Sequence, residues 1–241
     1  MTSFDGKRAV VIGGSSGVGA ATVRALNAQG CRVTAVARRA DGLRALGVES
    51  VQGDAEDPTL AERLFRELRP DVTVLTAGVT PPMGAIDELD WETFSQTWNG
   101  DVKASFHLVK QALRLPLAPG ASVVLVSSGA AIGGSPKSGG YAGAKRMQWL
   151  LADYAQKVSD ARKLGIRFAC VLPKQLIEGT TIAARASATY AEAMGITAET
   201  YMKRWDVPLD VDKVAAAILG AVDAPGGSAI AVTGKGVEPL S

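Results

Sequence analysis

The sequence has few of the residues that metal sites and nucleophilic enzymes use. It contains one histidine, His107, and two cysteines, Cys31 and Cys170, none of which has a partner at the spacing of metal ligands. No metal is therefore expected. A serine–histidine–aspartate triad would have to use His107, which lies in a helical pattern, and we interpret this histidine as a helix-surface or packing residue. Both cysteines lie in apolar segments, where we expect them to pack as small apolar groups.

Long apolar runs and strongly charged runs are also missing. No stretch approaches the ~18 apolar residues of a membrane helix, and the first residues contain no signal-peptide core. The 26 Lys and Arg nearly balance the 24 Asp and Glu, giving a net charge of +2 at pH 7. No basic stretch with interleaved aromatics indicates nucleic-acid binding. We therefore expect a soluble, cytoplasmic protein that binds neither nucleic acid nor a membrane.

What the chain does have is an alternation of short β-branched runs with longer helical patterns. Hydrophobic residues make up 47% of the 241 residues, enough for a large core. The runs show little polar alternation, as is typical of strands buried on both faces. They predict strands at residues 8–12, 32–37, 50–53, 71–76, 122–127, 166–172 and 228–233. Helical patterns include residues 57–68, with Asp57 as N-cap and Pro58 as the first helical residue, and about 91–113 and 141–164.

This order predicts an α/β fold. We expect a single Rossmann-type domain over residues 1–241, in which a doubly wound, mostly parallel, seven-stranded sheet carries helices on both faces. One region, residues 174–206, breaks the rhythm, and long excursions of this kind often cover a binding site. Its apolar side chains suggest an apolar or ring-shaped substrate, although they are equally ordinary core residues: Tyr190, Met194, Tyr201, Met202 and Trp205. Its basic side chains would instead favour an acidic substrate: Lys174, Arg185, Lys203 and Arg204.

A glycine-rich loop follows the first predicted strand and precedes the first predicted helix. Glycines in this place let the chain turn sharply and let the backbone approach a pyrophosphate, which the N–H groups of the helix N-terminus then bind. In this context the loop predicts a dinucleotide site. Its candidate cofactor-binding residues are Gly13, Ser15, Ser16, Gly17, Val18 and Gly19.

The ends of the next strands indicate which dinucleotide is bound. After the second strand, where NAD sites usually place a carboxylate, the sequence has Ala37 followed by Arg38 and Arg39. The guanidinium of Arg38 can bind a 2′-phosphate, so NADP(H) is favoured over NAD(H). Further candidate cofactor contacts close the third and fourth strands. They are Asp54, which can accept from the adenine amino group or cap its own turn, with Ala55, Ala77 and Gly78.

The candidate catalytic residues lie at and after the fifth predicted strand. Tyr141 and Lys145 are four residues apart and so share one helix face, and Ser128 lies thirteen residues before the tyrosine. A lysine ammonium beside a tyrosine hydroxyl favours the phenolate, which makes the tyrosine a proton donor and acceptor near neutral pH. A serine hydroxyl can hold the oxygen that exchanges this proton.

Taken together and in this order, these motifs resemble the short-chain dehydrogenase/reductase family, classical type, over nearly the whole chain. The resemblance adds Pro173, after the sixth strand, to the cofactor contacts. It implies hydride exchange between a nicotinamide cofactor and a small carbonyl or alcohol substrate, with Tyr141 as general acid/base. It further implies that Lys145 binds the nicotinamide ribose, that Ser128 positions the substrate oxygen, and that the protein forms homotetramers or dimers through its long helices.

Four positions depart from the family pattern. Ile12 stands where a threonine often braces neighbouring turns, Leu75-Thr76 stands for two asparagines, and Pro173-Lys174 stands for Pro-Gly. The fourth is Asp101, which occupies the place of an asparagine that supports a water-linked proton relay to the lysine. Asp101 can serve through its backbone carbonyl, with Gly100 allowing the same local kink, or its carboxylate can hold Lys145 charged more firmly and shift the pH optimum. These departures motivate an alternative function, a catalytically weak or idle NADP-binding sensor or scaffold.

Overall fold

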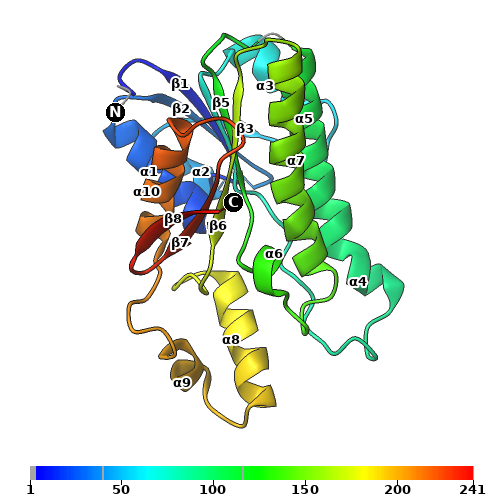
Figure 1. Ribbon diagram of the computed structural model, residues 1–241. Coiled ribbons are helices and arrows are strands. Elements are labelled where there is room, and N and C mark those ends of the chain that lie inside the picture. The colour runs from blue at the N-terminus through cyan, green and yellow to red at the C-terminus, as the bar shows by residue number, and fades with distance from the viewer. Residues whose placement is uncertain (1–3, 40, 116, 241) are drawn as a thin grey trace.

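A computed structural model describes residues 4–39, 41–115 and 117–240. Its centre is an eight-stranded sheet with the order β3-β2-β1-β4-β5-β6-β7-β8 (Figure 1). The first seven strands are parallel, and the eighth pairs antiparallel with the seventh. The strands are β1 (Arg8–Ile12), β2 (Arg32–Ala37), β3 (Glu49–Gln52), β4 (Val72–Leu75), β5 (Ser122–Val126), β6 (Arg167–Pro173), β7 (Ala229–Thr233) and β8 (Gly236–Leu240).

Helices cover both faces of this sheet, as the alternation predicted. On one face lie α3 (Leu60–Leu68), α5 (Lys103–Arg114) and α7 (Tyr141–Ala161), and on the other α1 (Gly17–Ala28) and α10 (Val211–Val222) (Figure 1). The remaining helices are α2 (Asp41–Arg44), α4 (Trp91–Thr97), α6 (Ala130–Gly133), α8 (Thr181–Ala193) and α9 (Ala198–Met202). The doubly wound α/β fold is therefore confirmed.

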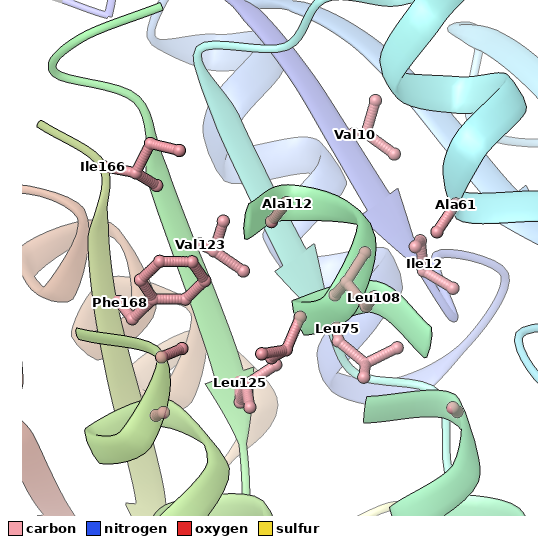
Figure 2. Close-up of a cluster of buried hydrophobic side chains, with 14 of the residues drawn as sticks. Val10, Ile12, Ala61, Leu75, Leu108, Ala112, Val123, Leu125, Ile166 and Phe168 are labelled. Atoms are coloured by element: carbon pink, nitrogen blue, oxygen red, sulfur yellow. The ribbon is translucent and has the colours of Figure 1, made fainter. Parts of the chain in front are cut away.

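The two cores explain why the strands show so little polar alternation. Successive strand residues point to opposite faces, so Val10 and Ile12 face the core of α3, α5 and α7 while Ala9 and Val11 face the core of α1 and α10. Figure 2 shows the first of these cores, where Leu108 of α5 and Phe168 of β6 are both fully buried. A strand with an apolar layer on each side needs apolar residues at every position.

Three sequence-based expectations are corrected. The sheet has eight strands instead of seven, because Gly236–Leu240 forms a short hairpin partner at the sheet edge, where Pro239 needs no ladder partner for its missing N–H. Helix α3 begins at Leu60, because Asp57 Oδ1 accepts from the N–H of Thr59 in a turn before the helix, at 2.8 Å. The helix expected over 91–113 is interrupted by a π-helical segment, η1 (Trp98–Val102).

The topology creates the place where a ligand can bind. From β1 the chain first adds strands on one side, β2 and β3, and then continues on the other side with β4. The crevice at such a switch point, beyond the carboxyl ends of the strands, is where open parallel sheets bind ligands. The glycine loop after β1 and the turn after β4 both lie at this edge. Within the described residues, no helix has the length and apolar content to cross a membrane.

Candidate active site

Tyr141 and Lys145 lie at the start of α7, where the helix meets the end of β5. Tyr141 is the first residue of α7 and Lys145 follows one turn later, so both project from the same face. Both are buried, with relative exposures of 8% and 6%, and Lys145 Nζ lies 5.5 Å from the centroid of the tyrosine ring. The sequence spacing therefore brings the two side chains together, as predicted.

Ser128 is placed by contacts of its two neighbours. The hydroxyl of Ser127 donates to the main-chain carbonyl of Lys145 at 2.6 Å, which fixes the end of β5 against the first turns of α7. The N–H of Gly129 donates to the carbonyl of Pro173 at 2.7 Å, which joins the same turn to the end of β6. Ser128 is half-buried between these ties, and its Oγ accepts from the N–H of Ala130 at 3.2 Å.

Asp101 forms a buried ion pair with Lys145. It is fully buried in η1, and its Oδ2 lies 2.9 Å from Lys145 Nζ. Its other oxygen, Oδ1, accepts from the N–H of Val79, in the turn after β4, at 2.6 Å. Of the two readings left open by the sequence, the structure thus shows the carboxylate in direct contact with the lysine. Gly100 permits this packing, because a Cβ there would overlap the side chain of Val79.

The charge of Lys145 follows from these neighbours. Burial opposes the charged form, but the Asp101 carboxylate, with a further contribution from Tyr141, outweighs that effect and raises the pKa of Lys145 above its ordinary value. Lys145 is therefore an ammonium at neutral pH. Its Nζ also donates to Gln148 Oε1 at 2.9 Å.

The glycine loop is shaped to receive a phosphate group. Gly13 adopts a φ of +94°, and a Cβ at this position would collide with the backbone of Ala77, so the turns after β1 and β4 touch directly. Ser16 precedes α1 without capping it through its side chain, and a Cβ at Gly17 would meet only the methyl group of Thr180, at 3.8 Å. The start of α1 is thus open beside Gly17 and is not capped by the Ser16 side chain, which fits a dinucleotide pyrophosphate at its first N–H groups.

Thr76 supplies the side-chain hydrogen bond between the turns after β1 and β4 that Ile12, with no hydroxyl, cannot make. Its hydroxyl donates to the carbonyl of Ile12 at 3.1 Å, and the N–H groups of Thr76 and Ala77 reach the same oxygen at 2.8 and 3.0 Å. The hydroxyl that links the two turns therefore comes from the residue after β4 instead of the last residue of β1. The two departures noted in the sequence compensate each other here.

The other candidate cofactor residues lie along the same edge. Arg38 and Arg39 are exposed just beyond β2, and the carbonyl of Arg38 accepts from Gln52 Nε2 at 2.9 Å. Asp54 is exposed after β3, and its Oδ1 accepts from the N–H of Glu56 at 3.0 Å, so it does cap its own turn. Ala55 is half-buried against the core beside it. Ala77 and Gly78 follow β4, where a Cβ on Gly78 would lie 3.3 Å from Asp101 Oδ1.

Lys174 does not leave a free charge next to Pro173. Its ammonium pairs with Glu238 Oε1 of β8 at 2.6 Å. The edge strand that the sequence did not reveal therefore neutralises the lysine that stands in place of the family's glycine.

The segment over residues 174–206 forms α8 and α9 and extends from the carboxyl edge of the sheet (Figure 1). Its aromatic residues pack on one another: Tyr190 stacks on Tyr201 with ring centroids 5.9 Å apart, and Trp205 meets Tyr201 edge-on at 6.2 Å. The Tyr190 hydroxyl lies 2.8 Å from Ser135 Oγ and also accepts from the N–H of Lys137, so α8 is tied to the loop that leads to Tyr141. Met194, by contrast, is 58% exposed.

An open hollow of about 650 Å³ lies between α8, α9 and the loop before α8. Glu178, Thr180 and Met202 are among its lining residues, and Ser128, Tyr141 and Lys145 are not. We therefore place the chemistry at the start of α7 and regard this hollow as part of the covering segment.

Sequence reasoning missed three residues of the site: Ser127, Ser105 and Gln148. Two of them carried a signal in the sequence, since Gln148 is three residues after Lys145 and Ser105 is four after Asp101, spacings that place helical neighbours side by side. The π-helical segment that sets the orientation of Asp101 had no such signal. Among the described residues, no three His, Cys, Asp or Glu side chains gather as a metal site would require.

Comparison of the sequence with known proteins identifies the family of this chain. The family model for short chain dehydrogenases matches residues 7–191. Short-chain dehydrogenase reductase 4 of Arabidopsis thaliana is 30% identical over 211 residues, covering 80% of this chain and 70% of that protein. Carbonyl reductase [NADPH] 2 of Sus scrofa is 33% identical over 134 residues, covering 52% of this chain and 54% of that protein. The chain belongs to the short-chain dehydrogenase family, as its motifs indicated.

Solved structures support the fold over almost the whole chain. A variant of the actinorhodin polyketide ketoreductase with NADPH matches with a TM-score of 0.83 and 23% identity, over 97% of this chain and 98% of that one. An NAD⁺-bound xylitol dehydrogenase matches with a TM-score of 0.85 and 18% identity, over 97% of this chain and all of that one. At these identities the likeness concerns the fold, and the two neighbours carry different cofactors.

Proposed function

We propose that the protein is an NADP(H)-dependent oxidoreductase that interconverts a carbonyl and an alcohol, with Tyr141 as the general acid/base. Membership in a family of oxidoreductases supports the reaction class. The observation that carries the proposal is the burial of Tyr141 and Lys145 on one face of α7, beside the turn that holds Ser128. A tyrosine next to a buried ammonium is stabilised as the phenolate, so it can release a proton to a substrate oxygen.

Each residue of the site has a separate task in this proposal. Ser128 Oγ donates a hydrogen bond to the substrate oxygen and holds it near the tyrosine. Tyr141 gives its proton to that oxygen during reduction and accepts it during oxidation. Lys145 stabilises the phenolate electrostatically and would hold the ribose of a bound cofactor. A bound nicotinamide supplies or accepts the hydride.

The preference for NADP(H) rests on the end of β2. Ala37 offers no side-chain acceptor to a ribose hydroxyl, and the exposed guanidinium of Arg38 follows it directly. A guanidinium binds a phosphate through two parallel hydrogen bonds. The carbonyl of Arg38, which accepts from Gln52, anchors this part of the backbone in place for such a contact. The name of the pig relative, carbonyl reductase [NADPH], agrees with this assignment.

We further propose that residues 174–206 cover a small-molecule substrate and that the protein assembles into homo-oligomers through its long helices. The contacts of the Tyr190 hydroxyl with Ser135 and Lys137, in the loop that leads to Tyr141, support a covering role for α8. Aromatic residues on the long helices are half exposed, which suits a helix-to-helix interface: Phe106 at 47% and Tyr154 at 48%. We expect the protein to act in the cytoplasm, free of nucleic acid and membrane.

The test is turnover of a carbonyl panel. The purified protein is incubated with NADPH or NADH and a series of ketones and quinones, and cofactor oxidation is followed by absorbance. We expect NADPH oxidation with at least one substrate. Tight NADPH binding with no turnover across the panel would contradict the proposal and favour the sensor or scaffold alternative.

A further inference from the structure

The ammonium of Lys145 is buried next to two polar side chains, the carboxylate of Asp101 and the amide of Gln148. Two of its neighbours are protein acceptors at hydrogen-bonding distance, Asp101 Oδ2 at 2.9 Å and Gln148 Oε1 at 2.9 Å. An ammonium has three N–H donors. One donor is bonded to Gln148, the Asp101 carboxylate pairs with the ammonium through charge, and the centroid of the Tyr141 ring lies 5.5 Å from Nζ.

The two acceptors are themselves held in place. Gln148 Nε2 donates to Ser105 Oγ at 2.7 Å and approaches the main-chain carbonyl of Asp101 at 3.4 Å. Ser105 Oγ in turn donates to that carbonyl at 2.8 Å. All four residues are buried, with Asp101, Ser105 and Gln148 at 0% exposure. Together, Asp101, Ser105, Gln148 and Lys145 form a closed polar ring, which we call the lysine ring.

The lysine ring also engages the main-chain carbonyl oxygen of Asp101, which a water would need as its acceptor in order to pass protons to Lys145. The main-chain carbonyl of Asp101 already accepts from Ser105, and the amide of Gln148 lies beside it. The fully buried amide of Gln148 contacts both this carbonyl and Lys145 Nζ, so a water that linked the two would have to displace it.

We propose that Asp101, Gln148 and Ser105 are positioning residues that hold Lys145 as a fixed, permanently charged ammonium, so that Lys145 does not pass protons between Tyr141 and solvent. This inference rests on the proposed function of Tyr141 as general acid/base. In the reduction direction Tyr141 would give its proton to the carbonyl oxygen, and a bound nicotinamide would supply the hydride to the carbonyl carbon. Tyr141 is then a phenolate, and it regains its proton from water that enters on the substrate side, beneath α8.

The charged and titratable groups around Lys145 agree with this assignment. Asp101 faces it from η1 and Tyr141 from the same helix, and Cys170 approaches from β6. Burial, opposed in part by Lys145, raises the pKa of Cys170 to about 12, so this thiol stays neutral in the working range. The Asp101 carboxylate is therefore the group that fixes the charge of Lys145 when Tyr141 is protonated.

The proposal is tested first on the 241-residue protein without cofactor or substrate. The lysine side chains are labelled with ¹⁵N, and the ammonium signals are followed by NMR as the pH is raised. Lys145 is assigned by the loss of its signal in Lys145→Met. We expect its ammonium protons to exchange slowly with water and its signal to persist above pH 10.5, the ordinary lysine pKa.

Two variants probe the ring, and a third is the matched control. Asp101→Asn keeps the size and the acceptor for Val79 but removes the charge, and we expect the titration midpoint of Lys145 to fall by at least one pH unit, a tenfold loss in proton affinity. Gln148→Met keeps the length but removes the acceptor, and we expect at least tenfold faster ammonium exchange. Asp153→Asn removes a carboxylate that pairs with Lys157 on the exposed face of α7, at 2.7 Å, and should leave Lys145 unchanged.

The outcomes separate this inference from the proposed function. An unchanged Lys145 midpoint in Asp101→Asn would overturn the inference, as would wild-type ammonium exchange as fast as that of exposed lysines. If Asp101→Asn does not fold, Gln148→Met decides, and unchanged exchange in that variant overturns the proposal. The pH profile of turnover with NADPH and a quinone is the second readout: Asp101→Asn should gain an alkaline limb at lower pH than the wild type. If the wild-type protein shows the expected NMR behaviour but converts no substrate, the proposed function is refuted and the inference about Lys145 stands.

Discussion

The hydroxyl of Ser127 donates to the main-chain carbonyl of Lys145 across 2.6 Å, in the buried joint between β5 and α7. This bond fixes the helix that carries Tyr141 and Lys145 against the strand that leads to Ser128. Residues that are thirteen positions apart in the sequence are thereby held at one edge of the sheet. The joint is the structural basis of the catalytic proposal, and it makes the roles of the individual residues testable.

Replacing Tyr141 with phenylalanine should remove catalysis and little else. The ring still packs at the start of α7, but no hydroxyl remains to exchange a proton, so we expect a loss of about 10²–10⁴-fold or more in kcat. NADPH binding, measured by cofactor fluorescence, should be nearly unchanged. Tyr154→Phe is the control, because Tyr154 is a half-exposed tyrosine on the same helix. Undiminished turnover in Tyr141→Phe would remove Tyr141 from its role.

Arg38→Ala should erase the preference for NADPH. The loss of hydrogen bonds to a charged phosphate costs about 1.5–3 kcal/mol, which corresponds to roughly 10–100-fold weaker NADPH binding. NADH binding should not change, since NADH lacks the phosphate. Arg44→Ala provides the comparison, as Arg44 is an exposed arginine in the neighbouring helix α2. Equal affinities of the wild type for the two cofactors would refute the Arg38 argument directly.

Asp101→Asn should destabilise the protein at neutral pH. Removing one partner of a buried ion pair leaves the other charge without compensation, at a cost of about 3–5 kcal/mol, measured by urea unfolding at pH 7. Because the pKa of Lys145 is raised in the folded protein, this contribution is fully present below the ordinary value of 10.5 and disappears as the pH rises through the folded value. The difference between wild type and variant should therefore shrink in strongly alkaline buffer.

The exposed pair of Asp153 and Lys157 offers the contrast. Asp153→Asn should change the free energy of unfolding by no more than about 1 kcal/mol, because solvent screens an exposed ion pair. A loss in Asp101→Asn no larger than that in Asp153→Asn would show that the buried pair contributes nothing special.

Tyr190→Phe should loosen the covering segment. The variant loses the hydroxyl contact with Ser135 at 2.8 Å but keeps the ring stacked on Tyr201. A hydrogen bond contributes about 1 kcal/mol, so local opening of α8 and α9 should become roughly fivefold more frequent. Hydrogen exchange of peptides from residues 181–202 measures this change. Identical exchange in wild type and variant would mean that the contact does not hold the cover.

Cys170 should resist alkylation in the native protein. Burial raises its pKa to about 12, so the reactive thiolate is nearly absent at pH 8. Iodoacetamide should modify Cys170 only after unfolding, as mass spectrometry of the peptide over β6 would show. Rapid modification under native conditions would indicate that the region around Lys145 opens to solvent.

Local patterns were enough to predict most of the fold. The apolar runs located the seven parallel strands to within a residue or two, since a strand covered on both faces leaves a continuous apolar signature. The edge strand β8 escaped because it is short, contains Pro239 and is exposed along most of its length. Its ion pair from Glu238 to Lys174 was therefore also out of reach.

By itself, the sequence determined the family, the glycine loop and the pair of Tyr141 and Lys145, because each depends on residues that are close together in the chain. Only the tertiary structure decided how Asp101 meets Lys145. That contact depends on a π-helical segment, on the turn at Val79 and on the buried amide of Gln148, which come from three different parts of the chain. A helical period predicts which side chains share a face, but the direction of a carboxylate in a widened turn is set by the packing around it.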